Sequence, residues 1–204
     1  MENVSIKDIL DSADKDKMER ILESSLEIFA RDGYEKASTN EIVMKAGISK
    51  GLLFHYFGSK RNLWIFLNDF VCEHIVEKIR DNIDWNESDL LNRARDITEL
   101  KVVAMKDYPG ILEFMRRSLS EKDQYLVNKL KDGDILEMME KVYVYNIDFS
   151  LFREDIDRSI IMDLIRFSFE GFSEKIRNME DLTLDVMREK LGEYLDALRK
   201  AYYR

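Results

Sequence analysis

The sequence predicts an all-α protein, and three observations support this prediction. Its 204 residues include one proline and eight glycines, too few for the many turns of a β-rich chain. Leucine, isoleucine, glutamate and lysine are frequent, and most of these residues favour helices. Apolar residues recur at helical spacing from about residue 18 to the C-terminus. We therefore expect helices joined by short connections.

Length and composition limit the class of protein. A chain of 204 residues allows one or two domains and buries a core without disulfides or a structural metal. Cys72 is the single cysteine, so no disulfide forms within a monomer and a reducing compartment is expected. The sequence shows neither a signal peptide nor about 20 consecutive apolar residues. We expect a soluble cytoplasmic protein without a membrane partner.

The first helices are predicted from their caps. An amphipathic helix from about Met18 to Phe29 ends near Gly33, a typical C-terminal cap residue. A second helix starts at the capping box Ser38-Thr39-Asn40-Glu41, in which the serine and glutamate satisfy each other's backbone donors. After a tight turn at Gly47-Ile48, Ser49 caps a third helix from about Lys50 to Tyr56.

The remaining chain continues the helical pattern. Ser59 is placed to cap a long fourth helix, and Pro109 to occupy the first turn of another. Further helices are expected at about Asp123 to Tyr145, Ile156 to Arg177 and Thr183 to Tyr203. We predict a helix-turn-helix domain at 1–60, with a leader at 1–16 and helices at about 17–57, and a helical regulatory and dimerisation domain at 61–204.

The distribution of charge matters more than the total. The net charge of −9 is unusual for a protein that binds nucleic acid. However, residues 33–62 hold five basic and two acidic side chains, and only the local charge has to face phosphate.

Residues 33–60 read GYEKASTNEIVMKAGISKGLLFHYFGSK. Together with the preceding amphipathic helix, this segment resembles the DNA-binding head of the TetR family over roughly residues 17–63. The family pattern has Gly-Tyr/Phe, a Thr/Ser-rich cap, Ala-Gly-Val-Ser-Lys-Gly, Tyr/Phe-His-Tyr-Phe and a Ser-Lys pair. Ala37 departs from it, because many members carry threonine there, which removes one capping or phosphate contact.

The third helix is the expected recognition helix. Leu53 and Phe57, four residues apart, point into the head and leave the opposite face free for the major groove. Lys50 and Lys60 lie in first turns of helices, where free N–H groups also attract phosphate. The predicted DNA-binding residues are Ser38, Thr39, Ser49, Lys50, Gly51, Leu52, Phe54, His55, Tyr56 and Lys60.

Leu52 and Phe54 have two interpretations. Apolar residues usually face inward, so both can belong to the core. The family resemblance instead implies exposure toward DNA, where they contact thymine methyl groups. For Lys50, Lys60 and His55 the alternative is an ordinary solvated surface.

Aromatic and methionine side chains are frequent after residue 63. A helical bundle lined by them can hold an apolar small molecule, although core packing alone explains most of them. We predict an unknown, largely apolar effector. Its candidate contacts are Trp64, Phe70, Trp85, Phe114, Met115, Tyr125, Met138, Tyr143 and Phe167.

The last two helices are the predicted dimer interface. Apolar residues between Ile160 and Ile176 cover more than one helix face, which exceeds the needs of one core contact. Two such helices from each subunit form a four-helix contact, and the resemblance also implies a homodimer. The interface candidates are Ile161, Leu164, Ser168, Gly171, Phe172, Leu191, Tyr194, Leu195 and Leu198.

The functional prediction is a DNA-binding regulator, most simply a repressor released from a near-palindromic operator by its effector. Enzymes are disfavoured, because the sequence lacks His-Glu-x-x-His, a phosphate-binding glycine loop and a nucleophile elbow. Cys72 and His74, two residues apart on one helix, point in different directions. We expect no catalytic residue, cofactor or metal site. The open alternative is a helical adaptor whose head binds protein instead of double-stranded DNA.

Overall fold

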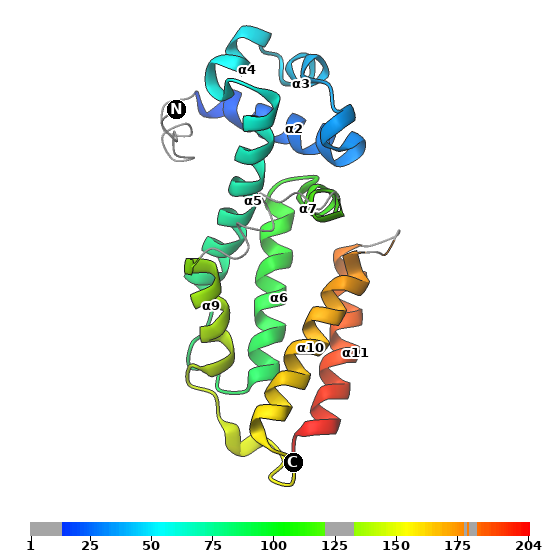
Figure 1. Cartoon of the computed structure of the whole chain (residues 1–204). Helices are drawn as coiled ribbons and strands as arrows, with labels where there is room; N and C mark the ends of the chain where they lie inside the picture. The colour runs from blue at the N-terminus through cyan, green and yellow to red at the C-terminus, as the bar shows by residue number, and fades with distance from the viewer. Residues whose placement is uncertain (1–13, 121–132, 178, 180–182) are drawn as a thin grey trace. The chain divides into compact units, whose positions relative to one another are not determined.

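A computed structural model describes residues 14–120, 133–177, 179 and 183–204 (Figure 1). Within these residues the regular elements are helices, which confirms the all-α prediction. An isolated β-bridge joins Phe152 and Tyr203. The helices are α2 (Lys15–Lys36), α3 (Thr39–Ala46), α4 (Lys50–Phe57), α5 (Lys60–Asn82), α6 (Leu90–Asp107), α7 (Ile111–Ser120), α9 (Gly133–Val144), η1 (Phe149–Leu151), α10 (Arg158–Arg177) and α11 (Leu184–Tyr202).

The described residues divide into two compact units. The first unit contains 14–77 and 104–120, and the second contains 78–103 and 133–204. Helices α5 and α6 each contribute to both units. The first unit thus adds much of α5 and all of α7 to the helix-turn-helix residues. The functional division at residue 60 stays a prediction.

Two glycines determine where helices end and begin. Gly33 has φ of 73° and ψ of 173°, so it interrupts α2 as predicted, but one further turn follows and the helix ends at Lys36. The expectation that Pro109 lies in a first helical turn is wrong. Gly110, at φ of 91°, cannot be helical, so α7 begins only at Ile111.

The body helices are close to their predicted ranges. α10 begins at Arg158 instead of Ile156, and α11 runs from Leu184 to Tyr202 with the Thr183 side chain capping the Val186 N–H. The predicted helix at 123–145 lies partly outside the described residues, and α9 accounts for its second part.

Trp64 is at the centre of the first unit. It is fully buried, and its ring centroid lies 5.1 Å from that of Phe29, 5.6 Å from that of Tyr34 and 5.0 Å from that of Phe114. One α5 side chain therefore packs against both α2 and α7. Aromatic pairs at such distances add to the stability that burial of their area provides.

A buried polar contact also joins α5 to α7. The Asn68 amide donates to the Trp64 carbonyl at 2.9 Å, and the Ser118 hydroxyl donates to Asn68 Oδ1 at 2.6 Å. Both side chains are almost completely buried, and buried polar groups need such partners.

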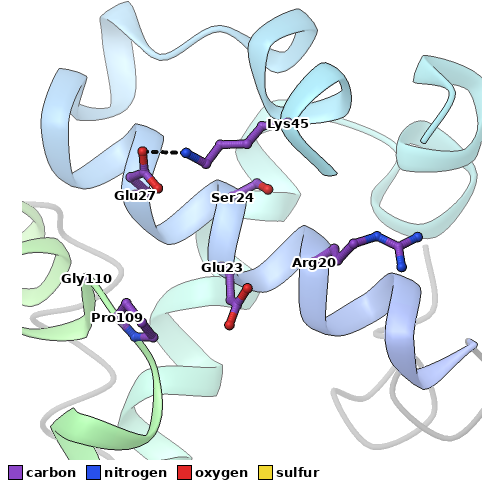
Figure 2. A pocket seen from close by; sticks show the side chains of 7 residues that line it. All are labelled: Arg20, Glu23, Ser24, Glu27, Lys45, Pro109 and Gly110. Carbon is purple, nitrogen blue, oxygen red and sulfur yellow. Dashed lines mark hydrogen bonds and ion pairs between the residues drawn. The ribbon is translucent and has the colours of Figure 1, made fainter. Parts of the chain in front are cut away.

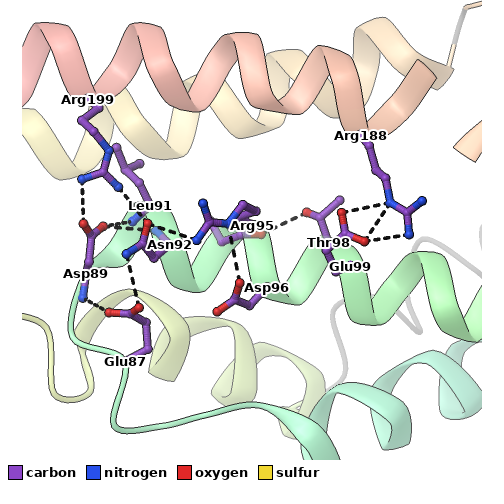
Figure 3. Close-up of polar contacts among 11 residues, drawn as sticks. Glu87, Asp89, Leu91, Asn92, Arg95, Asp96, Thr98, Glu99, Arg188 and Arg199 are labelled. Carbon is purple, nitrogen blue, oxygen red and sulfur yellow. Dashed lines mark hydrogen bonds and ion pairs between the residues drawn. The ribbon is translucent and has the colours of Figure 1, made fainter. Parts of the chain in front are cut away.

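In the second unit, α6 and α11 are joined by ion pairs (Figure 3). Arg199 donates to Asp89 Oδ2 at 2.7 Å, and the Tyr203 hydroxyl donates to Asp89 Oδ1 at 2.9 Å. Asp89 Oδ1 also accepts the backbone N–H groups of Leu91 and Asn92, which caps the start of α6. One carboxylate thus holds the start of α6 to the end of α11.

Replacing Asp89 with asparagine is expected to lower the free energy of unfolding at pH 7 by about 2 kcal/mol, because Arg199 loses a charged hydrogen-bond partner. Burial raises the pKa of Asp89, but hydrogen bonds from Arg199, the Asn92 N–H and Tyr203 outweigh it and leave this pKa below its ordinary value. The carboxylate therefore stabilises the fold above about pH 4 and ceases to do so as pH falls through the lowered pKa.

Urea unfolding at pH 7 and at pH 3 tests this prediction. The difference between Asp89→Asn and the parent should shrink at the lower pH. Asp155→Asn is the matched control, because Asp155 pairs with Arg153 on the exposed surface and such pairs contribute little. An equal loss in both variants would contradict the assignment.

Candidate nucleic-acid interface

Helices α3 and α4 form a helix-turn-helix, and the side chain of the predicted serine caps the start of each. Ser38 Oγ accepts the Glu41 N–H at 3.4 Å, and Ser49 Oγ accepts the Leu52 N–H at 3.1 Å. Between the helices, Gly47 adopts the left-handed conformation at φ of 64° and ψ of 38°, which glycine adopts without strain. The Glu41 carboxylate accepts from Arg31 at 2.9 Å.

One face of α4 is buried and the other is accessible. Leu53 and Phe57 are 1% and 5% exposed, as their spacing predicts. Leu52, Phe54 and Tyr56 are partly exposed, so neither interpretation of the two apolar residues describes them fully. The exposed positions at the start and end of this face are Ser49, Lys50, Gly51 and His55.

The two candidate phosphate-binding lysines have different surroundings. Lys50 is exposed at the first turn of α4, with its ammonium 5.9 Å from the Phe54 ring centroid. Lys60 begins α5, donates to the Glu35 carbonyl at 3.0 Å and lies 5.0 Å from the Tyr34 ring centroid. Lys50 therefore has the greater freedom to reach a phosphate or a base.

Two exposed polar residues of the head, Asn40 and Lys36, were not among the predicted contacts. Asn40 is exposed in the first turn of α3, beside the partly exposed Thr39 and Ser38, and Lys36 is exposed at the end of α2. The sequence signal for Asn40 was its place inside the capping box. By contrast, Lys45 pairs with Glu27 at 2.6 Å, which reduces the free positive charge of α3.

A series of aromatic contacts links α4 to α5 and to the turn after α6. We call it the ring series: Tyr56, Phe57, Phe66, Phe70 and Tyr108. Successive ring centroids are 6.2, 5.0, 6.4 and 5.1 Å apart. Helix α4 is thus packed continuously against α5 within the first unit.

The predicted effector contacts are distributed over both units. Trp64, Phe70, Phe114 and Met115 belong to the first unit, and the first three are buried in its core. Trp85, Met138, Tyr143 and Phe167 belong to the second unit, where Phe167 is 60% exposed. Tyr125 lies outside the described residues.

Two open depressions occur on the described surface, and these effector candidates line neither. One, of about 400 Å³, lies in the first unit, and Figure 2 shows charged side chains around it. Its lining residues are Arg20, Glu23, Ser24, Glu27, Lys45, Pro109 and Gly110. The other, of about 370 Å³, is lined by α10 and α11 residues that include Ser168, Tyr194 and Leu198. The charged side chains around the first depression do not suit a wholly apolar ligand.

The dimer candidates fall into two groups. Five are at most 7% exposed within their own subunit, because α10 and α11 turn them toward its interior; these are Ile161, Phe172, Leu191, Leu195 and Leu198. The other four, Leu164, Ser168, Gly171 and Tyr194, are partly or fully exposed. Ile160 and Phe167 add exposed apolar surface on α10, at 52% and 60%.

Two further features are absent from the described residues. They contain no group of three or more His, Cys, Asp or Glu side chains suited to a metal ion. None of the helices in this part of the chain has the length and hydropathy needed to span a membrane.

Comparison with known proteins gives consistent matches. The family described as "Bacterial regulatory proteins, tetR family" matches residues 21–65. The HTH-type transcriptional repressor AcnR of Corynebacterium glutamicum is 34% identical over 179 residues, 87% of this chain and 88% of that protein. The uncharacterised HTH-type transcriptional regulator YvdT of Bacillus subtilis is 32% identical over 71 residues, 35% of this chain and 37% of that protein.

The fold is also found among solved structures. A TetR family transcriptional regulator from Chloroflexus aurantiacus superposes with a TM-score of 0.66 at 16% sequence identity. The superposition covers 96% of this chain and 97% of the other.

Proposed function

The chain belongs to the tetR family of bacterial regulatory proteins, and from this we propose that it is an operator-specific transcriptional repressor acting as a homodimer. The observation that carries the proposal is the exposed face of α4, with Lys50 at its start and His55 at its end. The similarity to a named transcriptional repressor over most of the chain supports repression of transcription over activation.

Contacts to DNA follow from the chemistry of this face. Lys50 either neutralises a phosphate or donates to guanine, while Leu52 and Phe54 contact thymine methyl groups. Side-chain hydroxyl, imidazole and ammonium groups donate hydrogen bonds to phosphates; these groups belong to Ser38, Thr39, Ser49, His55, Tyr56 and Lys60. Gly51 permits close approach of the protein backbone to the DNA. Two heads related by a two-fold axis then read half-sites about 34–36 Å apart, or a multiple of that distance.

The dimer interface that we propose is the exposed apolar side of α10 with the neighbouring part of α11. Ile160, Leu164 and Phe167 supply apolar area, and Tyr194 lies beside the α10–α11 depression. Exposed apolar side chains gathered on one helix are typical of a surface that a partner covers.

Effector control is proposed to act through α5. This helix begins beside α4 and continues into the second unit, and the ring series packs it against the recognition helix. A ligand that binds one arrangement of α5 more tightly than another shifts the population of DNA-competent heads. We propose a small, largely apolar ligand as this effector.

Selection from a random pool of DNA duplexes tests the function. We expect the intact protein to enrich a two-fold symmetric site, and a Lys50→Ala, Tyr56→Ala variant to fail to enrich it at the same salt concentration. The apparent affinity for the site should fall steeply as salt increases, because binding releases counterions from phosphate.

Lys106→Ala is the control for the loss of one charge, since Lys106 is exposed outside the helix-turn-helix. It should enrich the same site as the intact protein. Failure of the folded intact protein to enrich any site, with no salt-dependent binding, would refute the proposal and favour the protein-binding adaptor.

A further inference from the structure

An aromatic corner in the second unit is formed by residues far apart in sequence. Trp85 follows α5 and Tyr145 follows α9. Their ring centroids are 5.7 Å apart and the rings are nearly perpendicular, at 86°. Perpendicular rings present two faces to one space, an arrangement that suits a cation.

This corner already holds a cation from the chain itself. The Lys141 ammonium lies 4.3 Å from the Trp85 ring centroid and 4.8 Å from that of Tyr145. Both distances are within the range of about 6 Å for cation–π attraction. Lys141 and Tyr145 are four residues apart and share a helix face, whereas Trp85 is brought in by the fold.

The corner is held in place without Lys141. The guanidinium of Arg93, which is 1% exposed, donates to the Tyr145 carbonyl at 2.7 Å and to the Trp85 carbonyl at 3.4 Å. Asn146 donates to the same Trp85 carbonyl at 3.2 Å. The backbones of both aromatic residues are therefore fixed by groups other than the lysine. The Arg93 guanidinium also lies 5.6 Å from the Trp85 ring centroid, so this ring keeps a packing partner when another cation replaces Lys141.

Solvent access and charge both favour exchange of this occupant. Tyr145 is 50% exposed and Lys141 is exposed. Segments 78–103 and 133–204 contain 16 basic and 22 acidic residues, so their net charge attracts cations.

The chemistry of the corner distinguishes among cations. A lysine ammonium is compact and strongly hydrated, whereas aromatic cages characteristically bind quaternary and methylated ammonium groups. We propose that Trp85 and Tyr145 form a binding site for the quaternary or methylated ammonium group of a small molecule, and that Lys141 is its exchangeable occupant. A regulatory role of this ligand rests on the function proposed above, and it would give the otherwise largely apolar effector one ammonium group.

Fluorine NMR of protein labelled with 5-fluorotryptophan tests binding directly. The chain has two tryptophans, so buried Trp64 serves as an internal reference for Trp85. We expect choline to shift the Trp85 resonance and leave that of Trp64 unchanged. The neutral isostere 3,3-dimethyl-1-butanol should have no comparable effect, because it lacks the charge.

Variants of the corner make the test specific. Lys141→Met removes the competing ammonium and keeps the apolar stem, so choline should bind about fivefold more tightly, the factor that corresponds to about 1 kcal/mol of cation–π attraction. Tyr145→Leu should abolish the shift while circular dichroism shows an intact helical fold.

The possible outcomes distinguish three claims: the ligand site, its regulatory role and the proposed function of the protein. No choline-dependent shift in either the parent or Lys141→Met at 100 mM choline would overturn the site, as would an equal response to the neutral isostere. A choline-dependent shift without any change in affinity for the selected operator would retain the site and overturn its regulatory role. Absence of operator binding in the ligand-free protein would contradict the proposed function alone.

Discussion

Replacing Trp64 with alanine is expected to reduce the free energy of unfolding by about 4 kcal/mol, the range found when a large buried aromatic side chain is truncated. Trp64 is fully buried and contacts rings on α2 and α7. Its removal leaves a cavity that three neighbouring rings cannot fill, because tightly packed helices relax only in part. The head would then lose one of its packing contacts with α5 and α7, while the ring series would still join α4 to α5.

Denaturant unfolding followed by far-ultraviolet circular dichroism measures this loss. Trp85→Ala is the matched control, since the same residue type is removed from a partly exposed position. We expect this control to cost less than half as much. A loss below about 2 kcal/mol for Trp64→Ala would show that the first unit does not depend on this packing.

The second large effect is expected at the α10 surface. Ile160→Glu combined with Phe167→Glu should raise the dimer dissociation constant at least about a thousandfold, equivalent to about 4 kcal/mol. A two-fold interface contains each substitution twice, so four carboxylates would have to be buried without partners, each at a cost of several kcal/mol. The resulting monomer would contact one half-site only.

Sedimentation velocity across a range of protein concentrations measures the dissociation constant. Met44→Glu is the control for adding a carboxylate at an exposed apolar position, because Met44 is 76% exposed on α3 in the first unit. It should leave the dimer unchanged. An unchanged dimer in the α10 variant would place the interface elsewhere.

Local features of the head were predictable because they depend on residues close in sequence. The hydroxyls of Ser38 and Ser49 each accept the backbone N–H of the residue three positions later and so cap a helix. Leu53 and Phe57 share the buried face of a single helix. Gly33 interrupts α2 for the same local reason. The sequence wrongly predicts Pro109 in the first turn of a helix. The next residue, Gly110, adopts a positive φ, and the fixed φ of proline gives no information about its neighbour.

The contacts that join helices were not predictable in the same way. Asp89 and Arg199 are 110 residues apart, and Asn68 and Ser118 are 50 residues apart. Neither pair has a spacing that distinguishes it from other polar residues. Arg93 reads as an ordinary surface arginine, yet it is buried and donates to carbonyls on the α5–α6 connection and on α9. Likewise, the sequence does not reveal that Trp64 packs against Phe29, Tyr34 and Phe114.

By itself, the sequence determined the all-α class, the helix-turn-helix and the exposed face of its recognition helix, because helical period and caps act over three or four residues. It also showed that α10 is apolar on more than one side. Only the tertiary structure decided that Ile161 and Ile165 face the interior while Ile160 and Phe167 remain exposed. That choice depends on which distant helices pack against α10, and periodicity within one helix carries no information about them.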